Sequence, residues 1–282
     1  MNLWYAFVDL LPFEWAQPGQ MFFMKNALLA ILVISPLFGV LSTMVVQSRM
    51  SFFSDALGHS AFTGIAIGTL CSLSQPLWAA ILFSLGFSLL FTWVRRWTTL
   101  ASDTVIGVFS STAVALGIFI ATLNGGSFTK FNSLLIGDVL SVRPGEIGLL
   151  ALILVLILVL WVRSYNALLL SALHPALADS RGIRIFWREA LLNAAIAVVV
   201  TVSMTWVGLL VINSLLVLPA AGARNVARNT RQYHLFSVLA ALVSGLCGLM
   251  TSYYVGASAG AAITLFLALW FAAAMALRKR SM

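Results

Sequence analysis

Two ionisable residues, Asp55 and His59, stand four positions apart at the start of a long apolar stretch of this sequence. In a helix, this spacing places both side chains on one face, one turn apart. A carboxylate oxygen and an imidazole nitrogen on one face make half of a site for a first-row divalent cation. The pair therefore predicts a metal-binding site, although neither residue type selects strongly among zinc, manganese and iron.

Two ligands are too few for a complete metal site. A symmetric dimer would set two copies of the pair face to face and would supply four ligands. The alternative is structural: Ser54 or Asp55 caps the start of the helix, and His59 is a core residue whose hydrogen bonds are satisfied. The two residues alone leave both interpretations open.

The elements that must position this pair are membrane helices. Of the 282 residues, 61% are hydrophobic and 9% are charged, whereas soluble domains carry about 25% charged residues. Apolar segments of membrane-crossing length recur from residue 27 to the C-terminus, and they are continuous rather than alternating, which excludes a β-barrel. The sequence predicts an all-α polytopic membrane protein with a single transmembrane domain, residues 1–282. An ionisable pair inside such a helix marks a pathway or a partner.

Nine crossings are expected, or eight if one segment is only half a helix. They are placed at 27–47, 52–72, 77–94, 104–123, 146–163, 189–206, 207–222, 235–253 and 259–277. Residues 1–22 are expected to form an interfacial segment, and residues 131–142 a partial or re-entrant helix. Trp206 and Gly208 mark the turn between the sixth and seventh segments.

The basic residues orient this topology. With the N-terminus outside, 13 of the 16 Lys and Arg residues lie on the inner side, as the positive-inside rule requires. The C-terminus is then expected in the cytoplasm. These inner loops also account for the net charge of +8, so no nucleic-acid partner is expected.

Residues 164–188 form the longest expected inner loop, with leucines set against charged residues. An amphipathic cytoplasmic loop predicts a docking element for a soluble partner. The alternative is a membrane-surface helix with no partner. Small residues after the ionisable pair favour close helix packing or a narrow pathway, and Gly64 and Gly68 have the GxxxG spacing.

Four stretches of the chain carry a resemblance as a set. They are RMSFFSDALGHSAFTGIAIG (49–68), ASDTVIGVFSSTAVALGI (101–118), LLIGDVLSV (134–142) and VGLLVINSLLVLPAAGARNVAR (207–228). Their order and spacing resemble those of the ABC-type divalent-metal permeases, the membrane subunits of bacterial zinc, manganese and iron importers. The resemblance covers the chain from about residue 22 to its end.

The resemblance implies a fold similar to that of the vitamin B12-type ABC importer permeases, placed in the bacterial plasma (inner) membrane. It implies a homodimer or a heterodimer with a related permease, a cytosolic P-loop ATPase and an extracytoplasmic metal-binding protein. Asp55 and His59 occupy the positions that line the path and contact the metal. The transported zinc, manganese or iron ion is expected as cargo, with no permanently bound cofactor. Thr63 stands where some manganese or iron relatives carry proline. This difference slightly favours zinc as the expected cargo.

The stretch LHPALADSRGI resembles the segment of this family that couples the permease to its ATPase. His174 stands where aspartate is usual, and Ala176 stands where glutamate is common. The candidate coupling residues are His174, Pro175, Ala178 and Gly182. Two further polar residues, Asp138 and Asn213, are candidates for the pathway or its entrance. The alternative role of Asp138 is a helix cap or a turn. The alternative role of Asn213 is a hydrogen bond to a neighbouring helix.

The sequence lacks a P-loop, because none of its three lysines follows the Gly-x-x-x-x-Gly pattern. The chain is therefore expected to be a transport subunit with no catalytic residues, and ATP hydrolysis is expected on another subunit. The alternative is a secondary metal transporter or channel that needs no ATPase. It would use the same two ligands but would have no use for an amphipathic inner loop.

Overall fold

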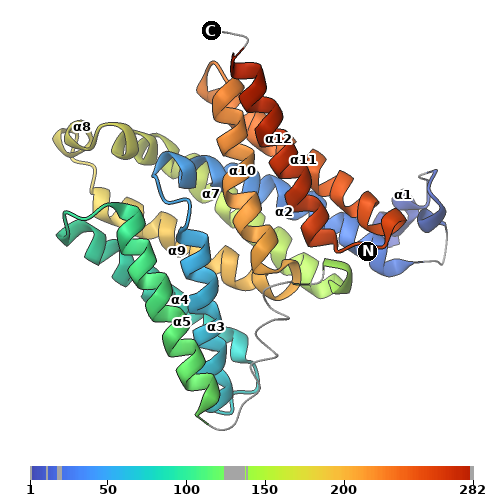
Figure 1. Cartoon of the computed structure of the whole chain (residues 1–282), viewed down its shortest axis with the longest axis horizontal. Helices are drawn as coiled ribbons and strands as arrows, with labels where there is room; N and C mark the ends of the chain where they lie inside the picture. The colour runs from blue at the N-terminus through green and yellow to red at the C-terminus, as the bar shows by residue number, and fades with distance from the viewer. Residues whose placement is uncertain (1, 11, 18–20, 124–136, 138, 280–282) are drawn as a thin grey trace.

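The computed structural model describes residues 2–10, 12–17, 21–123, 137 and 139–279, and the secondary structure within these ranges is helical (Figure 1). In chain order the elements are α1 (Asn2–Val8), the 3₁₀ turn η1 (Glu14–Ala16), α2 (Phe22–Gln47), α3 (Phe53–Leu70), α4 (Pro76–Trp97), α5 (Ser102–Thr122), the 3₁₀ turn η2 (Val139–Ser141), α7 (Pro144–Leu173), α8 (Pro175–Ser180), α9 (Ile185–Val207), α10 (Leu209–Val226), α11 (Thr230–Val255) and α12 (Ala259–Lys279).

Eight of these helices are long and apolar enough to cross a membrane: α2, α4, α5, α7, α9, α10, α11 and α12. The expected crossing at 52–72 forms α3, whose polar and small residues keep it outside that set. Neighbouring helices cover α3, and 12 of its 18 residues are buried. In α5, by contrast, only 22% of an apolar 18-residue stretch is buried. An all-α, multi-pass membrane architecture is thereby confirmed.

The helices pack in two sets. The first contains α3, α4 and α5, with α4 and α5 each lying along α3. The second contains α2, α10, α11 and α12, which pack against one another. Helix α9 packs mainly on α4, and α7 packs on α2. In Figure 1, α3, α4 and α5 form the lower left of the molecule, and α8 and α1 lie at opposite edges.

Glycine residues permit the close approach of α3 and α4. A Cβ atom on Gly64 would lie 2.5 Å from the Cα of Ala80, and one on Gly68 would lie 3.0 Å from the Cα of Pro76. A side chain at Gly64 would overlap the backbone of α4, and a side chain at Gly68 would make a contact tighter than usual with α4. The GxxxG spacing therefore serves a helix contact.

The apolar run at 189–222 divides into α9 and α10 at Gly208, as expected. Gly208 has φ +83° and ψ 152°, a conformation that residues with a side chain rarely adopt. Gly137 approaches this corner so closely that a Cβ on it would lie 2.2 Å from the Gly208 nitrogen. Of the expected partial helix at 131–142, only residues 137 and 139–142 are described, and they include the single turn η2.

Helix α7 continues ten residues beyond the expected end of its crossing at residue 163. Residues 164–172 contain no glycine or proline, so nothing in them ends a helix before Pro175. The segment expected as an inner loop at 164–188 is thus divided among the end of α7, the short helix α8 and the start of α9.

The N-terminal segment is tied to the start of α2 by a buried lysine. Lys25 has no solvent exposure; it pairs with the carboxylate of Asp9 and donates to the carbonyl of Gln17 at 2.9 Å. Trp4 donates its indole N–H to the backbone carbonyl of Lys25 at 3.0 Å. The predicted topology places Lys25 among the three basic residues of the outer side. The structure shows that it is an interior residue of this part of the fold.

Candidate metal site

Asp55 and His59 lie on consecutive turns of α3, with His59 Nε2 3.5 Å from Asp55 Oδ2. Two ligands of a tetrahedral metal ion, each about 2.1 Å from the ion, lie about 3.4 Å from one another. The observed separation of the two atoms matches that spacing. The distance between the two atoms is therefore compatible with two ligands of one ion.

The carboxylate of Asp55 does not cap α3. The residue before the helix is Phe52, which makes no side-chain capping bond, and the Ser54 hydroxyl is buried without a hydrogen-bond partner among the described residues. Asp55 instead accepts hydrogen bonds from two other helices: Asn213 Nδ2 of α10 donates to Oδ1 at 3.0 Å, and Ser110 Oγ of α5 donates to Oδ2 at 3.4 Å. The capping interpretation is wrong for this pair of residues.

Asn213 brings a second oxygen to the site. Its amide nitrogen binds Asp55, while its own Oδ1 is buried and has no hydrogen-bond partner in the described part of the chain. A buried acceptor of this kind is costly unless a donor or a cation satisfies it. The structure thus confirms the expected bond from Asn213 to a neighbouring helix, and it leaves an oxygen that could ligate a metal ion.

The site lies at an open face of the protein. The side chain of Asp55 is 40% exposed and that of His59 is 16% exposed. Helix α10 continues the same kind of surface with a stripe of partly or fully exposed residues spaced three or four apart: Leu210, Asn213, Val217, Ala221 and Arg224. The described residues contain no group of three or more His, Cys, Asp or Glu side chains that could hold a metal ion. Within the described residues, further ligands of an ion bound here would have to be neutral oxygens.

Thr63 has a role in helix packing. It is fully buried, and its hydroxyl donates to the carbonyl of Ala113 on α5 at 2.7 Å and to the carbonyl of His59 at 3.0 Å. The side chain that suggested zinc therefore joins α3 to α5 through backbone carbonyls. Its contacts give no ground for preferring one metal.

Ser110 is the site residue that the sequence interpretation missed. It stands 55 positions from Asp55, inside an apolar helix. The run Ser110, Ser111 and Thr112 is the signal that could have found it, because consecutive hydroxyl residues are unusual in a lipid-facing stretch. Asp138, proposed above for the entrance, lies outside the described residues.

The candidate coupling residues gather in and around α8. His174 is exposed and precedes the helix, Pro175 is its first residue, and Ala178 is fully buried. Gly182 follows the helix with φ +69°, in the left-handed region that glycine favours. Among the described elements, α8 makes its main contacts with its sequence neighbours α7 and α9. Much of its surface is therefore available to a partner.

Comparison with known proteins gives a consistent set of relatives. The family model described as the ABC 3 transport family matches residues 20–278. The chain is 28% identical to the high-affinity zinc uptake system membrane protein ZnuB of Haemophilus influenzae, over 90% of this chain and 97% of that protein. It is 28% identical to the manganese import system permease protein ScaB of Streptococcus parasanguinis, over 89% of each. Among solved structures, PsaBC from Streptococcus pneumoniae in complex with Fab matches with a TM-score of 0.77 and 26% identity, over 97% of this chain and 95% of that chain.

Proposed function

Because the chain belongs to the ABC 3 transport family, we propose that it is the membrane permease subunit of an ATP-driven importer for divalent transition-metal ions. The family match confirms the resemblance drawn from the four sequence stretches. A zinc uptake protein and a manganese import permease are similar to this chain along most of its length. They support a first-row divalent ion as the cargo, and zinc, manganese and iron all suit the ligands present.

The observation that carries this proposal is the Asp55–His59 pair and its surroundings. The carboxylate and the imidazole stand at the spacing of two metal ligands, and the amide of Asn213, which binds Asp55, has an oxygen without a partner among the described residues. As the ion enters, these three groups replace part of its water shell. The binding must also be weak enough to allow release on the other side.

A second copy of the chain, or a related permease, completes the path. The pair lies on an open face, and the described residues of one protomer supply too few ligands to enclose an ion. A two-fold axis close to α3 and α10 would bring two Asp55–His59 pairs and two exposed stripes of α10 together. The ion then crosses between the protomers.

ATP hydrolysis belongs to a separate cytosolic subunit that docks on α8. The positive-inside rule places the arginine-rich ends, α8 and the C-terminus in the cytoplasm of a bacterial inner membrane. His174, Pro175, Ala178 and Gly182 form the short element that transmits the motion of the ATPase. That motion opens the path alternately to each side. An extracytoplasmic metal-binding protein delivers the ion at the opposite face.

The test is uptake of manganese, zinc and iron into proteoliposomes that contain the permease purified with its ATPase. We expect Asp55→Asn and His59→Gln each to lower ATP-dependent uptake more than ten-fold while the complex still assembles. The matched control is Asp103→Asn, which removes an exposed carboxylate from the first turn of α5. Wild-type uptake by both site variants would contradict the metal assignment.

The alternative, a transporter that needs no ATPase, is tested with the same preparation. ATP-independent uptake by the purified chain alone, at the rate of the complex, would favour that alternative. A P-loop ATPase that co-purifies in a 1:1 ratio, together with uptake that stops without ATP, would support the importer.

A further inference from the structure

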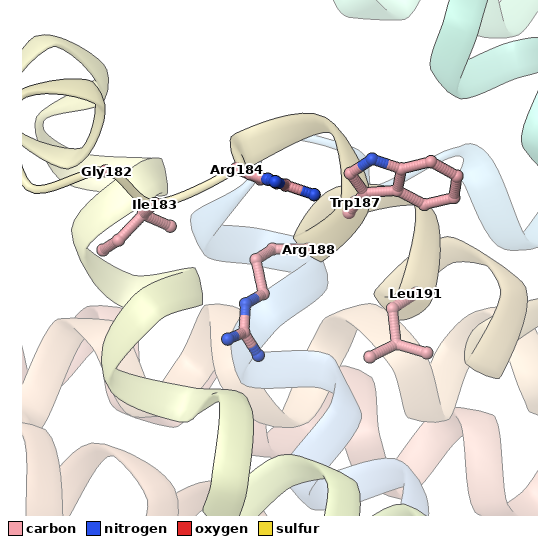
Figure 2. A pocket seen from close by; sticks show the side chains of 6 residues that line it. All are labelled: Gly182, Ile183, Arg184, Trp187, Arg188 and Leu191. Atoms are coloured by element: carbon pink, nitrogen blue, oxygen red, sulfur yellow. The ribbon is translucent and has the colours of Figure 1, made fainter.

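A pocket of about 500 Å³ lies where α9 begins, and it takes no part in the metal site. It is lined by Gly182, Ile183, Arg184, Trp187, Arg188 and Leu191. Figure 2 shows the side chain of Arg184 extending toward Trp187, with Arg188 and Leu191 farther along the same helix. Arg184 and Arg188 are four residues apart, and so are Trp187 and Leu191. Arg184 directly precedes α9, and Trp187, Arg188 and Leu191 lie in its first two turns, so two cationic and two apolar side chains line the pocket.

The pocket is strongly cationic. Arg188 is held in place by a hydrogen bond from Nη1 to Ser164 Oγ of α7 at 3.2 Å. An adjoining pocket shares Arg184 and Trp187 and adds Arg96 from the end of α4. Asp179 is the one acidic residue that lines either pocket. Three guanidinium groups against one carboxylate attract an anion, and the planar donors of arginine match the oxygens of a phosphate.

Apolar surface surrounds this cationic pocket. Trp187 is 63% exposed and Leu191 is 42% exposed. The neighbouring inner end of α4 exposes Trp97, and α7 exposes Val162. These helices are long and apolar enough to cross a membrane, so their exposed apolar side chains can contact acyl chains. Tryptophan and arginine at the end of such a surface occupy the level of the lipid headgroups.

We propose that this pocket binds the phosphate of an anionic phospholipid of the inner leaflet. Arg184 and Arg188 hold the phosphodiester, and Arg96 attracts it from the adjoining pocket. The acyl chains lie along Trp187 and Leu191 of α9. The pocket extends from the turn after α8 to the exposed apolar residues of α9. A bound lipid would therefore stabilise the start of α9, close to the proposed coupling helix.

The experiment is native mass spectrometry of the permease purified with its ATPase and titrated with phosphatidylglycerol or phosphatidylcholine. We expect preferential binding of phosphatidylglycerol, weakened about 25-fold in Arg184→Gln/Arg188→Gln, which is about five-fold, or 1 kcal/mol, for each arginine. The control is Arg228→Gln/Arg231→Gln, which removes the same charge from exposed positions around the start of α11. Arg184→Lys/Arg188→Lys keeps the charge and should retain most of the binding.

Equal binding of phosphatidylglycerol by the wild type and the Gln double variant would overturn the proposal. So would loss of the ATPase from that variant with lipid binding unchanged, because the pocket would then belong to the interface with the ATPase. The inference rests on the position of the pocket in the membrane and is independent of the metal pair. Asp55→Asn should therefore bind the lipid as the wild type does, even if its uptake is lost.

Discussion

The carboxylate of Asp55 is held from three directions, and Asn213 supplies the contact with α10. The amide donates at 3.0 Å, while its oxygen has no partner among the described residues. One side chain thus orients the acidic ligand and offers a further ligand. A hydrogen bond to a charged group contributes about 1.5–3 kcal/mol, so Asn213 should matter for affinity as well as for structure.

We therefore expect Asn213→Ala to lower metal uptake about ten-fold or more at limiting ion concentration, equivalent to at least about 1.4 kcal/mol. Uptake at saturating metal should fall less, because the pathway itself is intact. Kinetic measurements over a range of ion concentrations separate the two effects. The control is Asn225→Ala on the same helix, since the Asn225 amide donates to the carbonyl of Ala221 in its own α10. An unchanged apparent KM in Asn213→Ala would exclude a role in binding.

A second prediction at the scale of single residues concerns the Lys25–Asp9 ion pair and the stability of the N-terminal segment. Removal of one partner from a buried ion pair costs about 3–5 kcal/mol, because the other charge stays buried. Asp9→Asn should therefore loosen the N-terminal segment and expose it to limited proteolysis. Asp9→Asn combined with Lys25→Met removes both charges and should restore much of the protection. Equal cleavage of the wild type and Asp9→Asn would show that the pair contributes little.

The Asp55–His59 pair could be recognised in the sequence as a candidate metal site, because both of its members lie within about one turn of one helix. Its partners could not. Ser110 and Asn213 are 55 and 158 positions from Asp55, and only the packing of α5 and α10 on α3 brings them there. Thr63 shows the converse: it is close to the pair in sequence, but its hydroxyl is directed to backbone carbonyls of α3 and α5.

At the scale of whole helices, the packing of α3 requires close contact with α4. Gly64→Ala would set a Cβ 2.5 Å from the Cα of Ala80, so the two helices would have to separate. Overpacking of this kind costs about 1–3 kcal/mol, and we expect a lower thermal unfolding midpoint in detergent. The matched change is Gly86→Ala on α4, where a Cβ would meet nothing within 4 Å. If the midpoints of the two variants agree, the close crossing of α3 and α4 does not limit stability.

Helix positions were largely predictable from the sequence, whereas some helix ends were not. Long apolar runs locate α2, α4, α5, α7, α11 and α12, and the glycine at 208 separates α9 from α10. The end of α7 was misplaced because its last ten residues are more polar than a crossing but still favour a helix. Apolar content alone does not reveal such an extension.

For the whole molecule, Asp55 joins the two sets of helices. It belongs to the set of α3, α4 and α5, and it binds Asn213 of the set that contains α2, α10, α11 and α12. An ion bound by Asp55, His59 and Asn213 would strengthen that link. Metal binding should therefore stabilise the folded protein, by about 2.7 kcal/mol at 100 times the dissociation constant.

We expect manganese or zinc to raise the thermal unfolding midpoint of the purified complex, and a chelator to reverse the increase. The effect should be absent in Asp55→Asn. Magnesium at the same concentration is the control, since it retains its water shell and prefers oxygen ligands. An increase of the same size in Asp55→Asn would place the stabilising ion elsewhere.

The sheltered position of α3 has a consequence for biosynthesis. A segment that carries Asp55 and His59 gains little from contact with acyl chains, so it would not partition into the bilayer by itself as the ribosome delivers it. Helix α4, the next to emerge, covers it. A nascent chain whose first 75 residues have emerged from the ribosome should therefore leave α3 accessible to water-soluble reagents, and emergence of the residues up to 97 should bring it into the bilayer.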